Sequence, residues 1–185
     1  MSAADEALVF HEKGDNMVQN GMISAEDTAG KYIFWDIDGT LAAYRYNGHL
    51  ADPSGTNNGT SLSEIEEGIY LRRQPSRFMQ KVVADCHARS NIIMGHCRTQ
   101  KEMDDKQIWL DRYYPIMQER LITFEDQPKY ATILNYCRER NICLNEIIFV
   151  DDRLQILWEA ERHGILSYHI SSFLDWFLLS KAMEI

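Results

Sequence analysis

The stretch from Tyr32 to Thr40 constrains the fold of this chain more than any other, because four apolar or aromatic residues run directly into two closely spaced carboxylates. A continuous apolar run of this length is typical of a strand buried on both faces, as in a parallel sheet. Asp36 and Asp38 then fall at its C-terminal end, where open α/β sheets bind ligands. This stretch therefore predicts both a central strand and a site.

The one-residue spacing of these two acids has a chemical consequence. In an extended chain both carboxylates point the same way. Like charges held this close raise a pKa or recruit a cation, and a hard divalent ion such as Mg²⁺ prefers oxygen ligands. One carboxylate can then act as a nucleophile while the other handles protons. The plainer alternative is a solvated turn in which two acids merely close a strand.

Strand-like and helix-like segments alternate along the rest of the chain. This alternation predicts an α/β fold with a doubly wound parallel sheet of about five strands. The fourth strand ends, like the first, in a pair of acids, Asp151 and Asp152. If these two strands are neighbours, all four aspartates converge in one crevice. The later strands are expected at residues 92–94, 121–124, 147–150 and 165–170.

Helix starts are indicated by capping residues and prolines. Ser63 with Glu66, and Thr99 with Glu102, have the spacing of capping boxes. A further helix is expected to open at Pro75. The helix after Thr99 is expected to turn one stripe of side chains inward, formed by Met103, Gln107, Leu110 and Tyr114.

The 185 residues fit a single domain with one substantial core. We expect an N-terminal extension at 1–30, a catalytic core at 31–170 with a turn-rich flap at 42–61, and a C-terminal helix at 171–185. The apolar run 173–179 is either buried or part of a subunit contact, so a homo-oligomer is one expectation. Little sequence remains for a separate cap domain.

Composition excludes some classes of function. Apolar residues make up 45% of the chain and charged residues 25%, as in ordinary globular proteins. The net charge of −9 argues against a surface built to neutralise nucleic-acid phosphates. Neither a signal peptide nor a membrane-spanning run is evident, which favours a cytoplasmic location without membrane contact.

Polar groups follow the other expected strands as well. A His-Cys-Arg sequence follows the second strand, and Lys129 lies at a helix start, 22 residues before Asp151. An Asp-x-Asp-Gly-Thr motif combined with this lysine and an Asp-Asp pair is a specific signature. In these motifs the chain resembles the haloacid dehalogenase-like (HAD) hydrolases, over roughly residues 32–170. The resemblance implies a Rossmann-like core without a large cap, and a Mg²⁺-dependent phosphatase that acts on a phosphorylated substrate.

The resemblance also implies roles for individual residues. Asp36 would be the nucleophile that forms an aspartyl-phosphate, and Asp38 would act as general acid and then general base. Lys129 would offset the negative charge of the nucleophile and the phosphoryl oxygens. Mg²⁺ would be held by Asp36, the main-chain carbonyl of Asp38, and Asp151. Asp152 would bind a metal-bound water or contact the metal ligands rather than the metal itself.

The segment after the second strand departs from the family pattern. The family usually has a serine or threonine there that bonds the phosphoryl oxygen, whereas alignment on Arg98 places His96 at this position. An imidazole can donate the same bond, and the amide of Cys97 would contribute. Thr40 would help to hold the phosphate, whereas Thr99 is better explained as a helix cap.

Three alternatives remain open at this point. The sequence around Asp151 is similar to the phosphatase domain of polynucleotide kinase-phosphatases, which keeps a polynucleotide or nucleotide phosphatase as a subtype. A HAD-fold binding or scaffold protein with impaired catalysis is a second alternative, prompted by His96. A phosphoacceptor receiver module is disfavoured, because receivers place their acid pair early and their lysine after the fifth strand.

Overall fold

The computed structural model describes residues 21–43 and 60–177, and a five-stranded, all-parallel sheet forms its centre. The strand order is β3-β2-β1-β4-β5. The predicted α/β class and five-strand sheet are therefore confirmed. The strands are β1 (Tyr32–Trp35), β2 (Ser90–Cys97), β3 (Glu119–Phe124), β4 (Ile147–Asp151) and β5 (Ser167–His169).

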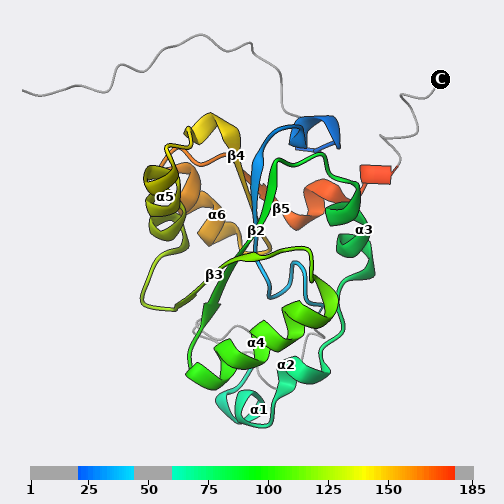
Figure 1. Cartoon of the computed structure of the whole chain (residues 1–185), viewed down its shortest axis with the longest axis vertical. Coiled ribbons are helices and arrows are strands. Elements are labelled where there is room, and N and C mark those ends of the chain that lie inside the picture. The colour runs from blue at the N-terminus through cyan, green and yellow to red at the C-terminus, as the bar shows by residue number, and fades with distance from the viewer. Residues whose placement is uncertain (1–20, 44–59, 178–185) are drawn as a thin grey trace, which may run out of the picture.

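Helices cover both faces of this sheet (Figure 1). One face packs against α3 and α4 through a core that includes Trp35 and Trp109, and the other against α5 and α6 through a core that includes Phe34 and Ile133. Apolar side chains of β1 thus alternate between two buried cores, as the continuous apolar run requires. The helices are α1 (Leu62–Glu66), α2 (Ile69–Arg72), α3 (Arg77–Asp85), α4 (Gln100–Tyr113), α5 (Lys129–Arg140) and α6 (Leu154–Glu161).

The central position of β1 brings the two acid pairs together. Tyr32 pairs with Ser90 of β2 on one side and with Ile147 of β4 on the other. The last hydrogen bond between β1 and β4 runs from the amide of Asp36 to the carbonyl of Val150, at 2.9 Å. Both acid pairs therefore leave the sheet at the same edge, at the point where the winding reverses.

Some local expectations need correction. The capping box before α1 is formed by Ser61 and Glu64, two residues earlier than expected. Pro75 lies before α3, whose N-cap is Ser76. Thr99 does cap α4, because its hydroxyl accepts a hydrogen bond from the amide of Glu102 at 3.1 Å.

The buried face of α4 matches the predicted stripe only in part, because Leu110 and Tyr114 are buried but Met103 and Gln107 are only half-buried. Its buried residues include three charged side chains, Glu102, Asp105 and Lys106, besides Trp109 and Leu110. The prediction followed helical spacing alone and could not include these charges. Glu102 and Lys106 bond each other, and Lys106 also bonds Asp38 and the carbonyl of His96 at the sheet edge. Asp105 is paired with Lys101.

Two aromatic residues of the C-terminal apolar run belong to the core, whereas Leu174 between them is exposed. Phe173 and Trp176 are fully buried, and the indole of Trp176 donates to Asp85 on α3 at 2.7 Å. Phe173 and Trp176 therefore pack inside this chain and are not exposed for contact with a second subunit. The residues described after β5 form the 3-10 helix Ile170–Phe173, a turn at 174–175 and the first helical residues at 176–177.

The remaining domain expectations fall largely outside the described residues. This holds for most of the N-terminal extension, for residues 44–59 of the predicted flap and for the end of the C-terminal segment. Within the described residues, η1 (Glu26–Thr28) precedes β1, and η3 (Leu144–Glu146) precedes β4. No helix in the described part of the chain has the length and apolar character needed to cross a membrane.

Candidate active site

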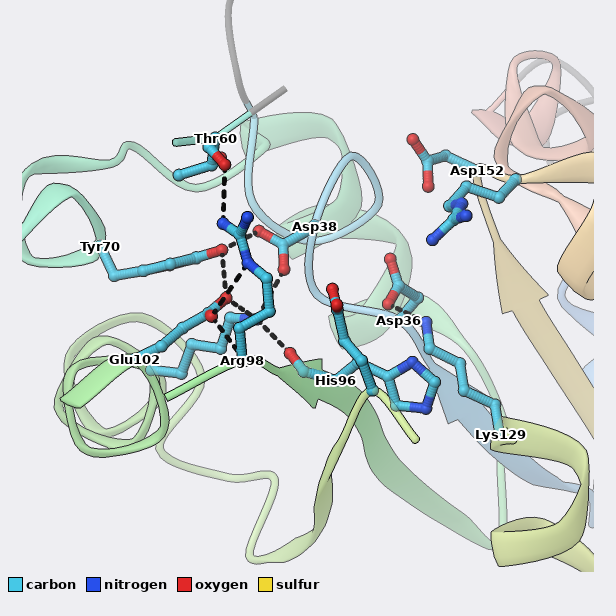
Figure 2. Close-up of a pocket in the computed structure, with 12 residues that line it drawn as sticks. Asp36, Asp38, Thr60, Tyr70, His96, Arg98, Glu102, Lys129 and Asp152 are labelled. Atoms are coloured by element: carbon cyan, nitrogen blue, oxygen red, sulfur yellow. Dashed lines mark hydrogen bonds and ion pairs between the residues drawn. The ribbon is translucent and has the colours of Figure 1, made fainter. Parts of the chain in front are cut away.

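A pocket lies at the C-terminal edge of the sheet and contains most of the predicted site residues (Figure 2). Asp36, Asp38, His96, Arg98, Lys129 and Asp152 all line it. They come from the ends of β1 and β2, the starts of α5 and α6, and the connections between these elements. The pocket therefore joins groups that lie far apart in the sequence.

Lys129 connects the ends of β1 and β4. Its ammonium donates to Asp36 Oδ1 and to Asp151 Oδ2, the latter at 2.7 Å. Burial alone would lower the pKa of Lys129, but Asp151 and Asp36 raise it above its usual value. The lysine is therefore charged at neutral pH, although only 6% of it is exposed.

Carboxylate oxygens of Asp36, Asp151 and Asp152 lie within 4.8 Å of one another. We call these three acids and Lys129 the strand-end cluster. Burial raises the pKa of Asp36 well above its usual value, Lys129 opposes this shift, and the neighbouring Asp151 adds to it. Three carboxylates gathered near one ammonium make this part of the pocket acidic, and a divalent cation would offset that charge. Three hard oxygen donors at this spacing fit Mg²⁺.

Asp38 is part of a separate network. Its Oδ1 accepts from the hydroxyl of Tyr70 at 2.9 Å and from Arg73 Nη1 at 2.5 Å, and its Oδ2 lies 2.8 Å from Lys106 Nζ. Glu102 joins the network through Tyr70 and Lys106, each at 2.9 Å. We call Asp38, Tyr70, Arg73, Glu102 and Lys106 the Asp38 cluster; its two carboxylates face two cations.

These contacts fix the charge of Asp38. Burial would raise the pKa of Asp38, but Lys106 and Arg73 outweigh that effect and hold it below its usual value. The two acids of the first motif thus share a pocket but engage different partners. The extended-chain expectation that they point the same way does not describe their contacts.

Known structures share this architecture. A scan of protein-family models and a search of curated proteins give no match. Among solved structures, the chain is similar to a HAD-superfamily hydrolase of subfamily IA from Geobacter sulfurreducens, with a TM-score of 0.50, 13% identity, and coverage of 78% of this chain and 89% of that one. A second similar structure is described as a candidate phosphoglycolate phosphatase from Lactobacillus plantarum, with a TM-score of 0.50, 15% identity, and coverage of 80% and 89%.

The chain has the HAD fold. At these identities the likeness extends to the fold and no further, and it confirms the architecture that the sequence motifs implied. In this HAD fold, the predicted nucleophile follows the central strand and the second acid pair follows the adjacent strand.

Three predicted site residues do not line the main pocket: Asp151, which is fully buried behind it against Lys129, Cys97 and Thr40. Cys97 is 1% exposed, and its thiol donates to the carbonyl of Thr123 at 3.3 Å. Thr40 lines an adjacent hollow with Asp152, and its buried Oγ1 has no hydrogen-bond partner among the described residues. The phosphate contacts suggested for Cys97 and Thr40 stay predictions.

Arg98 and Thr60 close one side of the pocket. Arg98 donates from Nη2 to the carbonyl of Thr60 at 2.6 Å, and its main-chain amide donates to Glu102 at 2.8 Å. Arg73 donates to the hydroxyl of the same threonine at 2.5 Å. Arg98 is thus held by the protein at the pocket wall.

Sequence reasoning missed the partners of Asp38. Glu102 and Lys106 are four residues apart, a spacing that usually marks a solvated pair on a helix surface. Tyr70 and Arg73 follow the turn-rich segment and belong to no motif. Arg153 was also missed, although it directly follows the second acid pair and lines the pocket.

Proposed function

We propose that this chain is a Mg²⁺-dependent phosphohydrolase that cleaves a phosphomonoester through an aspartyl-phosphate on Asp36. The observation that carries this proposal is the strand-end cluster, in which Lys129 lies between Asp36 and Asp151 and three carboxylates fit one divalent cation. Two solved structures of the same fold are described as a hydrolase and as a candidate phosphatase, which supports the same class of reaction.

The Mg²⁺ ligands would be Asp36, Asp151 and the main-chain carbonyl of Asp38, with Asp152 nearby. When bound, the ion would supply positive charge that allows an anionic carboxylate to approach an anionic phosphate. The amide of Asp36 bonds Val150 at the end of β4 and its carboxylate bonds Lys129, and both contacts support a nucleophile that is held in position before substrate binds.

Lys129 would act in both halves of the reaction. Its ammonium bonds one oxygen of Asp36, which leaves the other oxygen to attack phosphorus. As the phosphoryl group arrives, the same ammonium stabilises its oxygens without having to move far. The buried position of Lys129 strengthens this effect, because little water screens the charge.

Asp38 would handle protons in the second half of the reaction. Its lowered pKa keeps Asp38 ionised before substrate binds, which is the state a general base requires to take a proton from the attacking water, while Lys106 and Arg73 reduce its basicity. An ionised Asp38 is a poor proton donor for the first half. Phosphate esters with a weakly basic leaving oxygen, such as p-nitrophenyl phosphate, are therefore the best first substrates to try.

The test is phosphate release from p-nitrophenyl phosphate with Mg²⁺ and with EDTA, for wild type and Asp36→Asn. We expect activity that requires Mg²⁺ and falls by at least about 10³-fold in Asp36→Asn, because an amide cannot act as the nucleophile. Asp104→Asn is the matched control, since this exposed aspartate lies on α4 and, among residues 21–43 and 60–177, bonds only Gln100.

Two other outcomes would redirect the proposal. Magnesium binding without turnover, across a set of phosphorylated metabolites, nucleotides and 3′-phosphorylated oligonucleotides, would favour the scaffold alternative. Turnover confined to the oligonucleotides would select the polynucleotide subtype. Activity that persists in Asp36→Asn would contradict the assigned nucleophile.

A further inference from the structure

His96 lies between the strand-end cluster and the Asp38 cluster (Figure 2). Its ring is half-buried at the end of β2, and its Nε2 lies 2.7 Å from the main-chain carbonyl oxygen of Gln127. A carbonyl oxygen can only accept a hydrogen bond, so Nε2 carries the hydrogen and donates it. This bond therefore fixes the tautomer of the ring.

The charge of the ring follows from its surroundings. Burial, reinforced by the nearby ammonium of Lys129, lowers the pKa of His96 to about 4. The ring is thus neutral at neutral pH, and with its hydrogen on Nε2 it has only a lone pair on Nδ1. A neutral ring in this tautomer has no second N–H group to donate to a phosphoryl oxygen. His96 therefore does not reproduce the bond that a serine or threonine hydroxyl would make.

The carbonyl that His96 bonds belongs to the connection between β3 and α5. This connection begins with the amide of Glu125 bonded to Cys97 at 3.1 Å, and the amide of Gln127 bonds Phe124 at 3.0 Å. Pro128 follows as the N-cap of α5 and provides no side-chain capping bond. The ring of His96, on the neighbouring strand β2, thus anchors this connection at Gln127. Gln127 lies two residues before Lys129.

The position of α5 matters because Lys129 is its first residue. The Lys129 ammonium must reach Asp36 and Asp151 together. The rigid φ of Pro128 transmits a displacement of Gln127 to Lys129 with little loss. A displacement of about 1 Å at a catalytic group can lower turnover by about 10²-fold.

We propose that His96 is a positioning residue, which holds the β3–α5 connection through the Gln127 carbonyl and so places Lys129 against Asp36 and Asp151. This inference rests on the proposed phosphohydrolase function, in which Lys129 stabilises the nucleophile and the phosphoryl group. It assigns His96 a task other than direct contact with the phosphoryl oxygen.

Four substitutions separate these roles. His96→Gln places an amide N–H close to the position of Nε2, whereas His96→Asn places it close to Nδ1. His96→Ser provides the hydroxyl usual in the HAD hydrolases, and His96→Ala removes every polar atom of the side chain. His87→Ala is the control, because His87 is exposed and its ring has no hydrogen bond or ion pair within the described residues.

The first measurement is kcat and KM for p-nitrophenyl phosphate with Mg²⁺. We expect His96→Ala, His96→Asn and His96→Ser to lower kcat by about tenfold to 10²-fold, and His96→Gln to restore most of it. His96→Ala should have little further effect in a Lys129→Ala background, because it acts through that lysine. Rescue by serine rather than glutamine, additive effects with Lys129→Ala, or wild-type turnover in all four variants would overturn the proposal.

The second measurement does not depend on activity. Hydrogen exchange of the amides in residues 125–130 should be faster in His96→Ala than in wild type, and should return toward wild type in His96→Gln. If wild type proves inactive, the proposed function fails while this exchange pattern still reports on the anchor. Unchanged exchange in His96→Ala would overturn the anchor even in an active enzyme.

Discussion

The strand-end cluster and the Asp38 cluster share one pocket but differ in charge balance. In the strand-end cluster, Asp36 and Asp151 share the ammonium of Lys129, and the carboxylate of Asp152 lies close to both. In the Asp38 cluster, the carboxylates of Asp38 and Glu102 are matched by Arg73 and Lys106. The carboxylates of the Asp38 cluster are thus held by cations of the protein, whereas the strand-end cluster gathers three carboxylates around one ammonium. This difference supports the proposal that a divalent cation binds at the strand-end cluster.

Lys129→Met should produce the largest effect, because it removes the only cation of the strand-end cluster. We expect kcat to fall by about 10²–10³-fold. Without metal, the free energy of unfolding should fall by about 3–5 kcal/mol, because buried carboxylates lose their partner. Urea denaturation with EDTA and with Mg²⁺ measures this, and Mg²⁺ should recover part of the loss. A variant that keeps wild-type turnover would contradict the assigned role of Lys129.

Lys106→Met should destabilise the protein without creating a metal-sensitive defect. Lys106 is 1% exposed and bonds Asp38, Glu102 and the carbonyl of His96. Its loss should also cost about 3–5 kcal/mol, because the buried acids lose their cation. Mg²⁺ should stabilise this variant no more than it stabilises wild type. Greater recovery by Mg²⁺ here than in Lys129→Met would show that the metal is bound at the Asp38 cluster.

Acid should change the contributions of the two clusters to the free energy of unfolding in opposite directions. For one proton, the change is at most about 1.4 kcal/mol per pH unit. The pKa of Asp38 is lowered by folding, so its contribution is present above pH 3.8 and is lost as the pH falls through the folded value. The pKa of Asp36 is raised, so protonation of this group favours the folded state and its contribution grows as the pH falls through the folded value.

Urea denaturation in EDTA tests the direction of these two changes. The free energy of unfolding is measured from neutral pH down to below pH 3.8 for wild type, Asp38→Asn and Asp36→Asn. Asp38→Asn should lose stability less steeply in acid than wild type does. Asp36→Asn should lose it more steeply. Parallel curves for all three proteins would show that neither acid changes its pKa on folding.

Sequence reasoning predicted the strand-end cluster because its members sit next to strands. Asp36, Asp151 and Lys129 each follow a strand directly or by a short connection, and parallel strands end at a common edge. Short continuous apolar runs located those strands, so the residues at and after their ends could be placed without coordinates.

The Asp38 cluster was not predicted because its contacts depend on tertiary packing. Glu102 and Lys106 lie on a helix whose apolar spacing suggested a different inward face, formed by Met103 and Gln107. Charges on helices are usually solvated, so only the docking of α4 against the sheet edge marks these as buried. The anchor made by His96 was missed for a similar reason, since its acceptor is a main-chain carbonyl that leaves no trace in the sequence.

The amide of Asp36 makes the final rung of the β1–β4 ladder, with Val150 as its acceptor. The residue proposed to attack phosphorus therefore also makes the last hydrogen bond between the two strands that carry the acids. Opening of this one hydrogen bond would release the nucleophile while the rest of the sheet stayed paired. Hydrogen exchange of the Asp36 amide proton would then measure how often this last hydrogen bond opens, and so how often the proposed nucleophile is released.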